Sequence, residues 1–257
     1  MPELPEVEVV KRSLEKKIQN LTISNVKIND GNLRYKLNKG EISKLVGKRI
    51  KKIERRSKFL IFKINKNLKM LVHLGMTGKF FFVDKKKEKH KTSFYYNLNS
   101  SKDNKYDRVI FFLKHNQKLI YNDVRKFGFI KFYNSEEYES LHLRNLGPEP
   151  LGKECDFNYF KKYIKGRKRK IKDILMDQRC ISGLGNIYVN EILFQSNVRP
   201  YRKVSSIKDF EIKKIIKNIK KILKISIKLG GSSIKDFSSD DGKKGIFQQY
   251  FKVYGRK

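Results

Sequence analysis

The amino terminus carries a pair of residues that together could perform covalent chemistry. Removal of the initiator Met1 leaves Pro2 with a free secondary amine. An α-amino group has a pKa of roughly 7.7–8.0, so part of it is neutral at physiological pH and can form an iminium, or Schiff base, with an electrophilic carbon. Glu3 follows directly and is suited to proton transfer. Proline is common at position 2, and acidic residues often open a helix, so the pair alone is also compatible with a purely structural role.

Other short motifs hold residues with two open interpretations. Met76 and Phe127 are typical of a protein core, yet both lie in segments flanked by turns. His73 fits a packed core as well as a ligand site. Lys58 stands out from the many other lysines because it follows two arginines and opens an apolar run. Asn186 lies at a helix start, where it fits an N-cap; helix N-termini also bind phosphate, so capping and a contact to an anion are compatible there.

The charge of the chain indicates a polyanionic partner. Its 257 residues include 61 Lys and Arg against 26 Asp and Glu, a net charge of +35. Nucleic acid is the first expectation, and an anionic membrane surface the second. A hydrophobic content of 39% argues against a disordered basic tail, and no apolar run is long enough to span a membrane. Cys155 and Cys180 form no metal-binding or disulfide pattern, and we expect a reducing cytoplasm.

Apolar spacing predicts the elements that position these residues. Val7, Val10, Leu14 and Ile18 recur at helical spacing after the acidic start. Short runs rich in Phe, Ile, Tyr and Val follow, and they are typical of an antiparallel sandwich. The predicted strands cover residues 22–28, 59–64, 70–73, 79–83, 106–113, 118–122 and 129–133, with a polar excursion over residues 84–107.

The pattern becomes helical after residue 133. Helices are predicted to begin at Ser135 and near Asp156, and others cover residues 171–177, the stretch through Tyr188 and residues 207–229. The apolar stripe of the last helix is predicted to be core. A Gly- and Pro-rich segment at residues 146–150 predicts a linker between domains. The fold class is therefore α+β, with an N-terminal β-sandwich that has a leading helix, followed by an all-helical part.

The motifs, taken in order, resemble the bacterial formamidopyrimidine-DNA glycosylase family, which repairs oxidised purines. Glu3-Leu4-Pro5-Glu6 favours this branch over the endonuclease VIII branch. The resemblance implies a catalytic domain over residues 1–133 and a helix–two-turn–helix DNA-binding domain over residues 134–237. Residues 238–257 would be the end of a lesion-capping loop and the start of a truncated or absent zinc finger. The matching segments are residues 1–8, 55–60, 73–78, 123–128, 146–151, 183–188 with Glu191, 230–237 and 253–256, the last being a strand in the family.

The resemblance implies a bifunctional DNA glycosylase and abasic-site lyase that acts on 8-oxoguanine and formamidopyrimidines. Pro2 would attack the sugar C1′, Glu3 would protonate the opening sugar, and Lys58 would assist proton transfer or hold a phosphate. β- and δ-elimination would then nick the strand. An extruded base leaves a gap in the stack, and Met76, Arg125 and Phe127 are suited to filling it. The implied DNA contacts are His73, Tyr106, Arg108, Arg125, Lys126, Arg167, Lys172 and Asn186.

Two features depart from the family pattern. Lys105-Tyr106-Asp107-Arg108 stands where the family has Lys-His-Asp-His, and Tyr106 carries no charge at neutral pH, for which Arg108 would compensate. The family also continues into a four-cysteine zinc finger, whereas this sequence ends at Lys257 without those cysteines. The sequence is therefore either truncated or a member that works without the finger. No cofactor is expected in this chain, and a structural zinc is implied by the family alone.

The expected partner is double-stranded DNA that contains oxidised purines or abasic sites, with no membrane contact. We expect a monomer in a bacterial cytosol, associated with the nucleoid. Three alternatives stay open. These are an endonuclease VIII-like glycosylase for oxidised pyrimidines, a non-catalytic damaged-DNA-binding protein, and a basic nucleoid protein. Pro2, Glu3 and Lys58 argue against the second, because a pure binder needs no free N-terminal proline.

Overall fold

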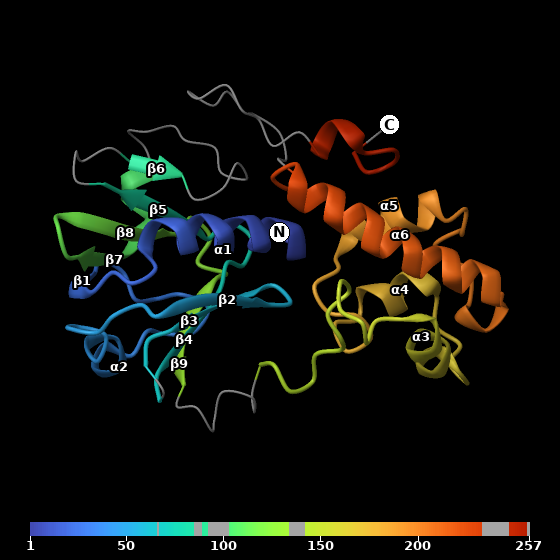
Figure 1. Cartoon of the computed structure of the whole chain (residues 1–257), viewed down its shortest axis with the longest axis horizontal. Helices are drawn as coiled ribbons and strands as arrows, with labels where there is room; N and C mark the ends of the chain where they lie inside the picture. The colour runs from blue at the N-terminus through green and yellow to red at the C-terminus, as the bar shows by residue number, and fades with distance from the viewer. Residues whose placement is uncertain (66, 85–88, 92–102, 134–141, 233–246, 256–257) are drawn as a thin grey trace.

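Helix α1 (Leu4–Ile18) opens the chain, and its apolar side is buried as the spacing predicts. Pro5 lies in its first turn, where a missing N–H breaks no hydrogen bond. In Figure 1, α1 lies along the two sheets, with its N-terminal end toward the helical half of the molecule. The computed structural model describes residues 1–65, 67–84, 89–91, 103–133, 142–232 and 247–255.

Two antiparallel sheets form the N-terminal half and confirm the predicted sandwich. One has the strand order β1-β7-β8-β5-β6 and the other β2-β3-β4-β9. Apolar side chains from both sheets and α1 form one continuous core. The strands are β1 (Ile23–Ile28), β2 (Lys52–Arg56), β3 (Phe59–Lys63), β4 (Lys69–His73), β5 (Lys79–Val83), β6 (Lys89–Lys91), β7 (Asp107–Leu113), β8 (Gln117–Asn122) and β9 (Phe129–Tyr133), with short helices α2 (Lys39–Ser43) and η1 (Asp103–Tyr106).

Strand β2 was not predicted, although it proves central to the site. Only Ile53 of its five residues is an apolar residue, so it lacks the pattern of a strand. It forms because it pairs in register with β3, which places Arg55 opposite Leu60 and Arg56 opposite Phe59. The polar excursion also contains a strand, because β6 lies within it and pairs with β5, which precedes it.

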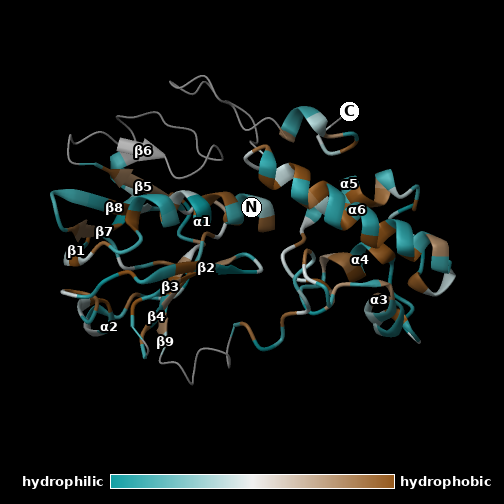
Figure 2. Ribbon diagram, in the orientation of Figure 1, coloured by the Kyte–Doolittle hydropathy of each residue, from teal (hydrophilic) through white to brown (hydrophobic). Residues whose placement is uncertain are grey.

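The helical half has a second core of its own. Asp156 caps the start of its first helix by accepting a hydrogen bond from Tyr159 N (2.8 Å). Apolar and polar residues alternate along α6 in Figure 2, as expected for a helix with one buried face. The helices are α3 (Phe157–Ile164), α4 (Ile171–Met176), α5 (Asn186–Gln195), η2 (Val204–Ser206), α6 (Asp209–Lys228) and η3 (Phe247–Tyr250).

Some expectations meet a different outcome or lie outside the described residues. Residues 252–255 form bends and turns, so the strand implied by the resemblance at residues 253–256 is wrong for residues 253–255, and residue 256 lies outside the described part. The helix predicted from Ser135 and most of the implied capping loop lie outside the described part. Among the described residues, no helix has the length and apolar content needed to cross a bilayer.

Candidate active site at the domain junction

Glu3 joins the two halves of the molecule through the start of α5. Its Oε1 accepts a hydrogen bond from Ile187 N (2.9 Å), and the next backbone amide, Leu4 N, donates to Gly183 O (3.0 Å). Helix α5 needs such a partner because its N-cap is Gly185, which has no side chain to satisfy the first N–H groups. A Cβ at Gly185 would lie 2.5 Å from Glu3 Cδ, so a larger residue here would displace the Glu3 carboxylate from α5.

Burial gives the Glu3 carboxyl unusual acid–base properties. The side chain is 3% exposed, and this desolvation raises its pKa to about 7. Lys58 and the backbone N–H groups of α5 oppose the shift, whereas Glu6 adds to it. A carboxyl group that keeps its proton near neutral pH can act as a general acid.

The amino terminus, Glu3 and Lys58 lie in one electrostatic neighbourhood. Burial lowers the pKa of the terminal amine, which belongs to Met1 in the structure, and Lys58 and Arg125 lower it further, while Glu3 and Glu6 oppose them. Burial likewise lowers the pKa of the 6% exposed Lys58, against the attraction of Glu3. The structure therefore brings the three proposed catalytic groups together, with Pro2 itself buried at the junction.

Glu6 was not predicted as a site residue, although it lies in the N-terminal motif. It is 1% exposed, and its Oε2 accepts a hydrogen bond from Glu3 N (2.9 Å). Its Oε1 accepts from Tyr188 Oη (2.6 Å) and from Ser232 N (2.7 Å). Glu6 thus connects the start of α1 to α5 and to the segment after α6. Only its position three residues after Glu3, at the start of a helix, signalled such a role.

Lys58 is positioned by the turn between β2 and β3. The turn consists of Ser57 and Lys58, and Ser57 has a φ of 55°, a left-handed conformation in which glycine is usual. Glu149, from the predicted linker, reaches this turn and accepts a hydrogen bond from Ser57 N (2.6 Å). Although burial alone would raise it, hydrogen bonds from Arg55, Ser57 and Arg56 hold the pKa of Glu149 below its usual range.

Met76, Arg125 and Phe127 form an exposed group, which we call the wedge. Met76 is 40% exposed and Phe127 is 46% exposed, so neither is a core residue. Arg125 Nη1 lies 3.1 Å from Met76 Sδ, and its guanidinium lies over the Phe127 ring, 4.5 Å from the centroid. The two loops that carry the wedge are joined, because Thr77 Oγ1 accepts from Arg125 N (2.9 Å) and donates to Asp123.

Arg108 and Lys126 hold the loop that carries Arg125 and Phe127 through contacts within the protein. Arg108 is 8% exposed; its Nε donates to Asp123 O (2.8 Å) and its Nη1 to Asp30 (2.9 Å). Lys126 Nζ pairs with the same Asp30 carboxylate at 2.7 Å. Both cations that the resemblance implied as DNA contacts thus form ion pairs with Asp30 within the protein. Tyr106 is half-buried, with the Arg108 guanidinium 5.6 Å from its ring centroid.

His73 can offer a neutral donor to an anion. Its Nδ1 accepts a hydrogen bond from Gly75 N (3.1 Å), which leaves the proton on Nε2. Burial, and next the positive charge of Lys58, lower its pKa to about 4. His73 is half-buried, and its ring stacks on Phe129 with 5.6 Å between centroids. An uncharged imidazole is therefore expected here at neutral pH.

The residues of the helical half that the resemblance implied as DNA contacts differ in their exposure to solvent. Asn186 is exposed and is the first residue of α5, which rules out the N-cap interpretation because Gly185 occupies that position. Arg167 is exposed, with its guanidinium 4.3 Å from the Tyr163 ring centroid. Lys172 is half-buried at the start of α4.

The residues present do not fit the zinc site that the family implies. Cys155 and Cys180 are both free and buried, and burial raises the pKa of the Cys155 thiol to about 11. Within the described part of the chain, no group of three or more His, Cys, Asp or Glu side chains is placed to hold a metal ion. No step of the chemistry is therefore assigned to a metal.

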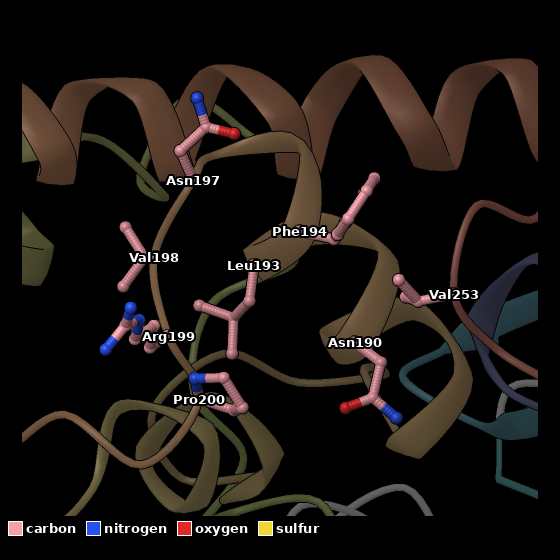
Figure 3. A pocket seen from close by; sticks show the side chains of 8 residues that line it. All are labelled: Asn190, Leu193, Phe194, Asn197, Val198, Arg199, Pro200 and Val253. Atoms are coloured by element: carbon pink, nitrogen blue, oxygen red, sulfur yellow. The ribbon is translucent and has the colours of Figure 1, made fainter.

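A pocket of 460 Å³ lies in the helical half, away from these groups. Figure 3 shows the apolar side chains of Leu193, Val198 and Pro200 on its wall, with Phe194 and Val253 at one side. None of the residues predicted for chemistry or DNA contact lines it. The site is therefore defined by the domain junction and not by this cavity.

Comparison with known proteins points to one family. The profile of the formamidopyrimidine-DNA glycosylase N-terminal domain matches residues 1–130, and that of the formamidopyrimidine-DNA glycosylase H2TH domain matches residues 146–238. The formamidopyrimidine-DNA glycosylases of Wolbachia pipientis subsp. Culex pipiens and Rickettsia felis are 40% and 39% identical to this chain, over 100% of it and 89% and 88% of their own lengths.

Solved structures agree with these matches. A complex between the Lactococcus lactis Fpg and DNA containing an abasic site superposes with a TM-score of 0.84 at 33% identity, covering 98% of this chain and 88% of that one. A complex of a Lactococcus lactis Fpg mutant with Fapy-dG containing DNA gives the same TM-score and identity, over 99% and 88%.

Proposed function

Since the chain belongs to the formamidopyrimidine-DNA glycosylase family, we propose that it excises oxidised purines from double-stranded DNA and then cleaves the abasic site. Its substrates would be 8-oxoguanine and formamidopyrimidines. One observation about the residues supports the proposal. The amino terminus, Glu3 and Lys58 lie together at the domain junction, and the positive charge of Arg125 from the wedge acts on the terminal amine.

The geometry supports a covalent mechanism. After removal of Met1, the Pro2 nitrogen would attack the sugar C1′ and the C1′–N bond to the damaged base would break; the proton lost by the amine would go to the departing base. Glu3 in its neutral form would give its proton to the sugar ring oxygen as the ring opens, which yields an iminium. The iminium acidifies C2′–H, and loss of that proton expels the 3′ phosphate; a second elimination expels the 5′ phosphate. Lys58, which is near enough to influence both groups, would assist proton transfer or hold a phosphate.

The protonation states suit these steps. Nucleophilic attack needs a neutral amine, and in the structure burial lowers the pKa of the terminal amine, which is that of Met1. Ring opening needs a protonated acid, and burial raises the pKa of Glu3 to about 7. Burial disfavours the charged form of each group, and the mechanism requires both groups in the neutral form.

The proposed DNA-binding surface extends from the wedge on one half to Asn186 and Arg167 on the other. The proposed domains are residues 1–133 and 134–237, followed by a terminal segment at residues 238–257. We also propose that the protein works as a monomer in the bacterial cytosol, at the nucleoid.

A panel of lesions tests the function. The protein is incubated with duplexes that contain 8-oxoguanine, a formamidopyrimidine, 5-hydroxycytosine or no lesion, and base release and strand cleavage are measured separately. We expect both products from the oxidised purines first. Faster release of the oxidised pyrimidine would favour the endonuclease VIII-like alternative. Tight binding without any product would favour the non-catalytic alternative.

Truncation of the wedge is expected to affect base excision more than strand cleavage. Met76→Ala or Phe127→Ala should slow excision of 8-oxoguanine from duplex DNA, because unstacking costs on the order of a few kcal/mol that the wedge offsets. Cleavage of a preformed abasic site in single-stranded DNA should change much less. Single-turnover rates on both substrates check this, and equal losses on both would contradict it.

Binding should depend steeply on salt, with unequal roles for neighbouring cations. Six phosphate contacts would give a log–log slope of roughly −5. Arg167→Ala should reduce this slope by about 1 and weaken damaged and undamaged duplex equally. Arg169→Ala is the matched comparison and should matter less, because Arg169 already pairs with Asp177 at 2.9 Å. A slope unchanged in the Arg167 variant would exclude that residue from the interface.

A further inference from the structure

Glu149 is the centre of a hydrogen-bonded cluster beside Lys58. Its carboxylate accepts from Arg55 Nη2 (2.6 Å), from Arg56 Nη1 (3.0 Å) and from Ser57 N (2.6 Å). The partners precede it by 92 to 94 residues, so the linker reaches back to the β2–β3 turn of the other half. Arg55 is further held by Glu8 of α1 (2.9 Å).

The contact to Ser57 does more than tie the halves together. Arg56 already does so, since it donates to Ser182 Oγ (2.7 Å) and to Gly147 O (2.7 Å). Ser57, in contrast, adopts a left-handed φ of 55° without being glycine, a strained conformation that persists where its surroundings enforce it. Glu149 accepts from its N–H and Arg55 donates to its carbonyl (2.9 Å).

The next residue in this enforced turn is Lys58. We propose that Glu149 is a positioning residue, which holds the Ser57 backbone so that the Lys58 amine lies beside Glu3 and the amino terminus. This role rests on the proposed function, because Lys58 has a task only if the chemistry takes place there. Glu149 touches no reacting atom, so its proposed effect on the chemistry passes through Lys58, whereas its pairs with Arg55 and Arg56 serve the docking of the two halves.

Glu149→Asp separates the two duties of this carboxylate. The long side chain of Arg55 can follow a retracted carboxylate and keep the ion pair, whereas the fixed N–H of Ser57 cannot. We expect the variant to melt close to the wild-type temperature and to bind abasic-site DNA as wild type does. Its single-turnover excision of 8-oxoguanine should fall by roughly tenfold or more, because small misplacements of catalytic groups are costly. Glu154→Gln, an exposed residue of the same segment, is the matched control and should be unchanged.

A double-mutant cycle with Lys58→Gln decides whether the effect passes through Lys58. We expect the Glu149→Asp loss to shrink to less than about twofold when Lys58 is already Gln. The same tenfold loss in both backgrounds, full activity of Glu149→Asp, or an unfolded variant would each overturn the proposal. If wild type and Glu154→Gln also fail to excise, the proposed function falls and the role of Glu149 falls with it.

Discussion

Glu3→Gln is expected to lose base excision by at least about 100-fold while lesion-DNA affinity stays nearly unchanged, because general acid catalysis contributes about 10²–10⁴-fold. The amide keeps the size of the carboxyl, and its oxygen can still accept the hydrogen bond from Ile187 N. What the variant lacks is the transferable proton. Single-turnover excision and equilibrium binding on the same 8-oxoguanine duplex provide the two measurements.

The same substitution should stabilise the fold at high pH. Glu3 titrates near 4.5 when unfolded and near 7 in the fold, so the folded state binds the extra proton between these values. The free energy of unfolding of wild type therefore falls as pH rises through this interval, and the variant escapes that loss. It should exceed wild type by up to about 3 kcal/mol above pH 7 and by little below pH 4. Denaturation of both proteins at both pH values checks the sign of this stability difference.

In the excision experiment, a loss of DNA binding equal to the loss of excision would mean that Glu3 has a structural role and not a catalytic one.

An extension at the amino terminus is expected to abolish excision and Schiff-base formation altogether. An added peptide converts the Pro2 nitrogen into an amide, which has no lone pair available for attack. The fold should survive, because Met1 is 43% exposed and offers the extension a way out. Pro2→Gly should keep part of the activity, since a primary amine still forms an imine.

The control for this experiment is the same peptide fused to the carboxyl end. Intact mass must confirm that the amino-terminal extension is retained, and thermal melting must confirm the fold. Undiminished excision by the extended, unprocessed protein would refute the N-terminal mechanism.

Local pattern was enough to predict the sandwich and the helical half. Phe, Ile and Val runs identified most strands, and the stripe on α6 identified its buried face. Strand β2 escaped because Lys52–Arg56 has a single apolar residue, and its existence depends on pairing with β3. The exposed positions of Met76 and Phe127 followed from their turn-flanked motifs and not from residue type.

Contacts distant in sequence could not be predicted. Arg108 was expected to contact DNA, and nothing in the local sequence indicated that it pairs with Asp30, 78 residues away. Glu149 lies in the predicted linker, but the neighbouring sequence did not indicate that its carboxylate would accept a hydrogen bond from Ser57 N. Glu6 likewise meets Ser232, 226 residues later. Such pairs depend on how the two halves dock, which periodicity and spacing do not encode.

The most direct test identifies the atom that becomes attached to DNA. The protein is reduced with borohydride while it acts on an 8-oxoguanine duplex, the adduct is digested with protease and nuclease, and the modified peptide is fragmented in a mass spectrometer. The account predicts a sugar remnant on the nitrogen of Pro2, in a peptide that lacks Met1. A remnant on Lys58, whose buried amine lies beside the same site, or bound DNA without any adduct would contradict it.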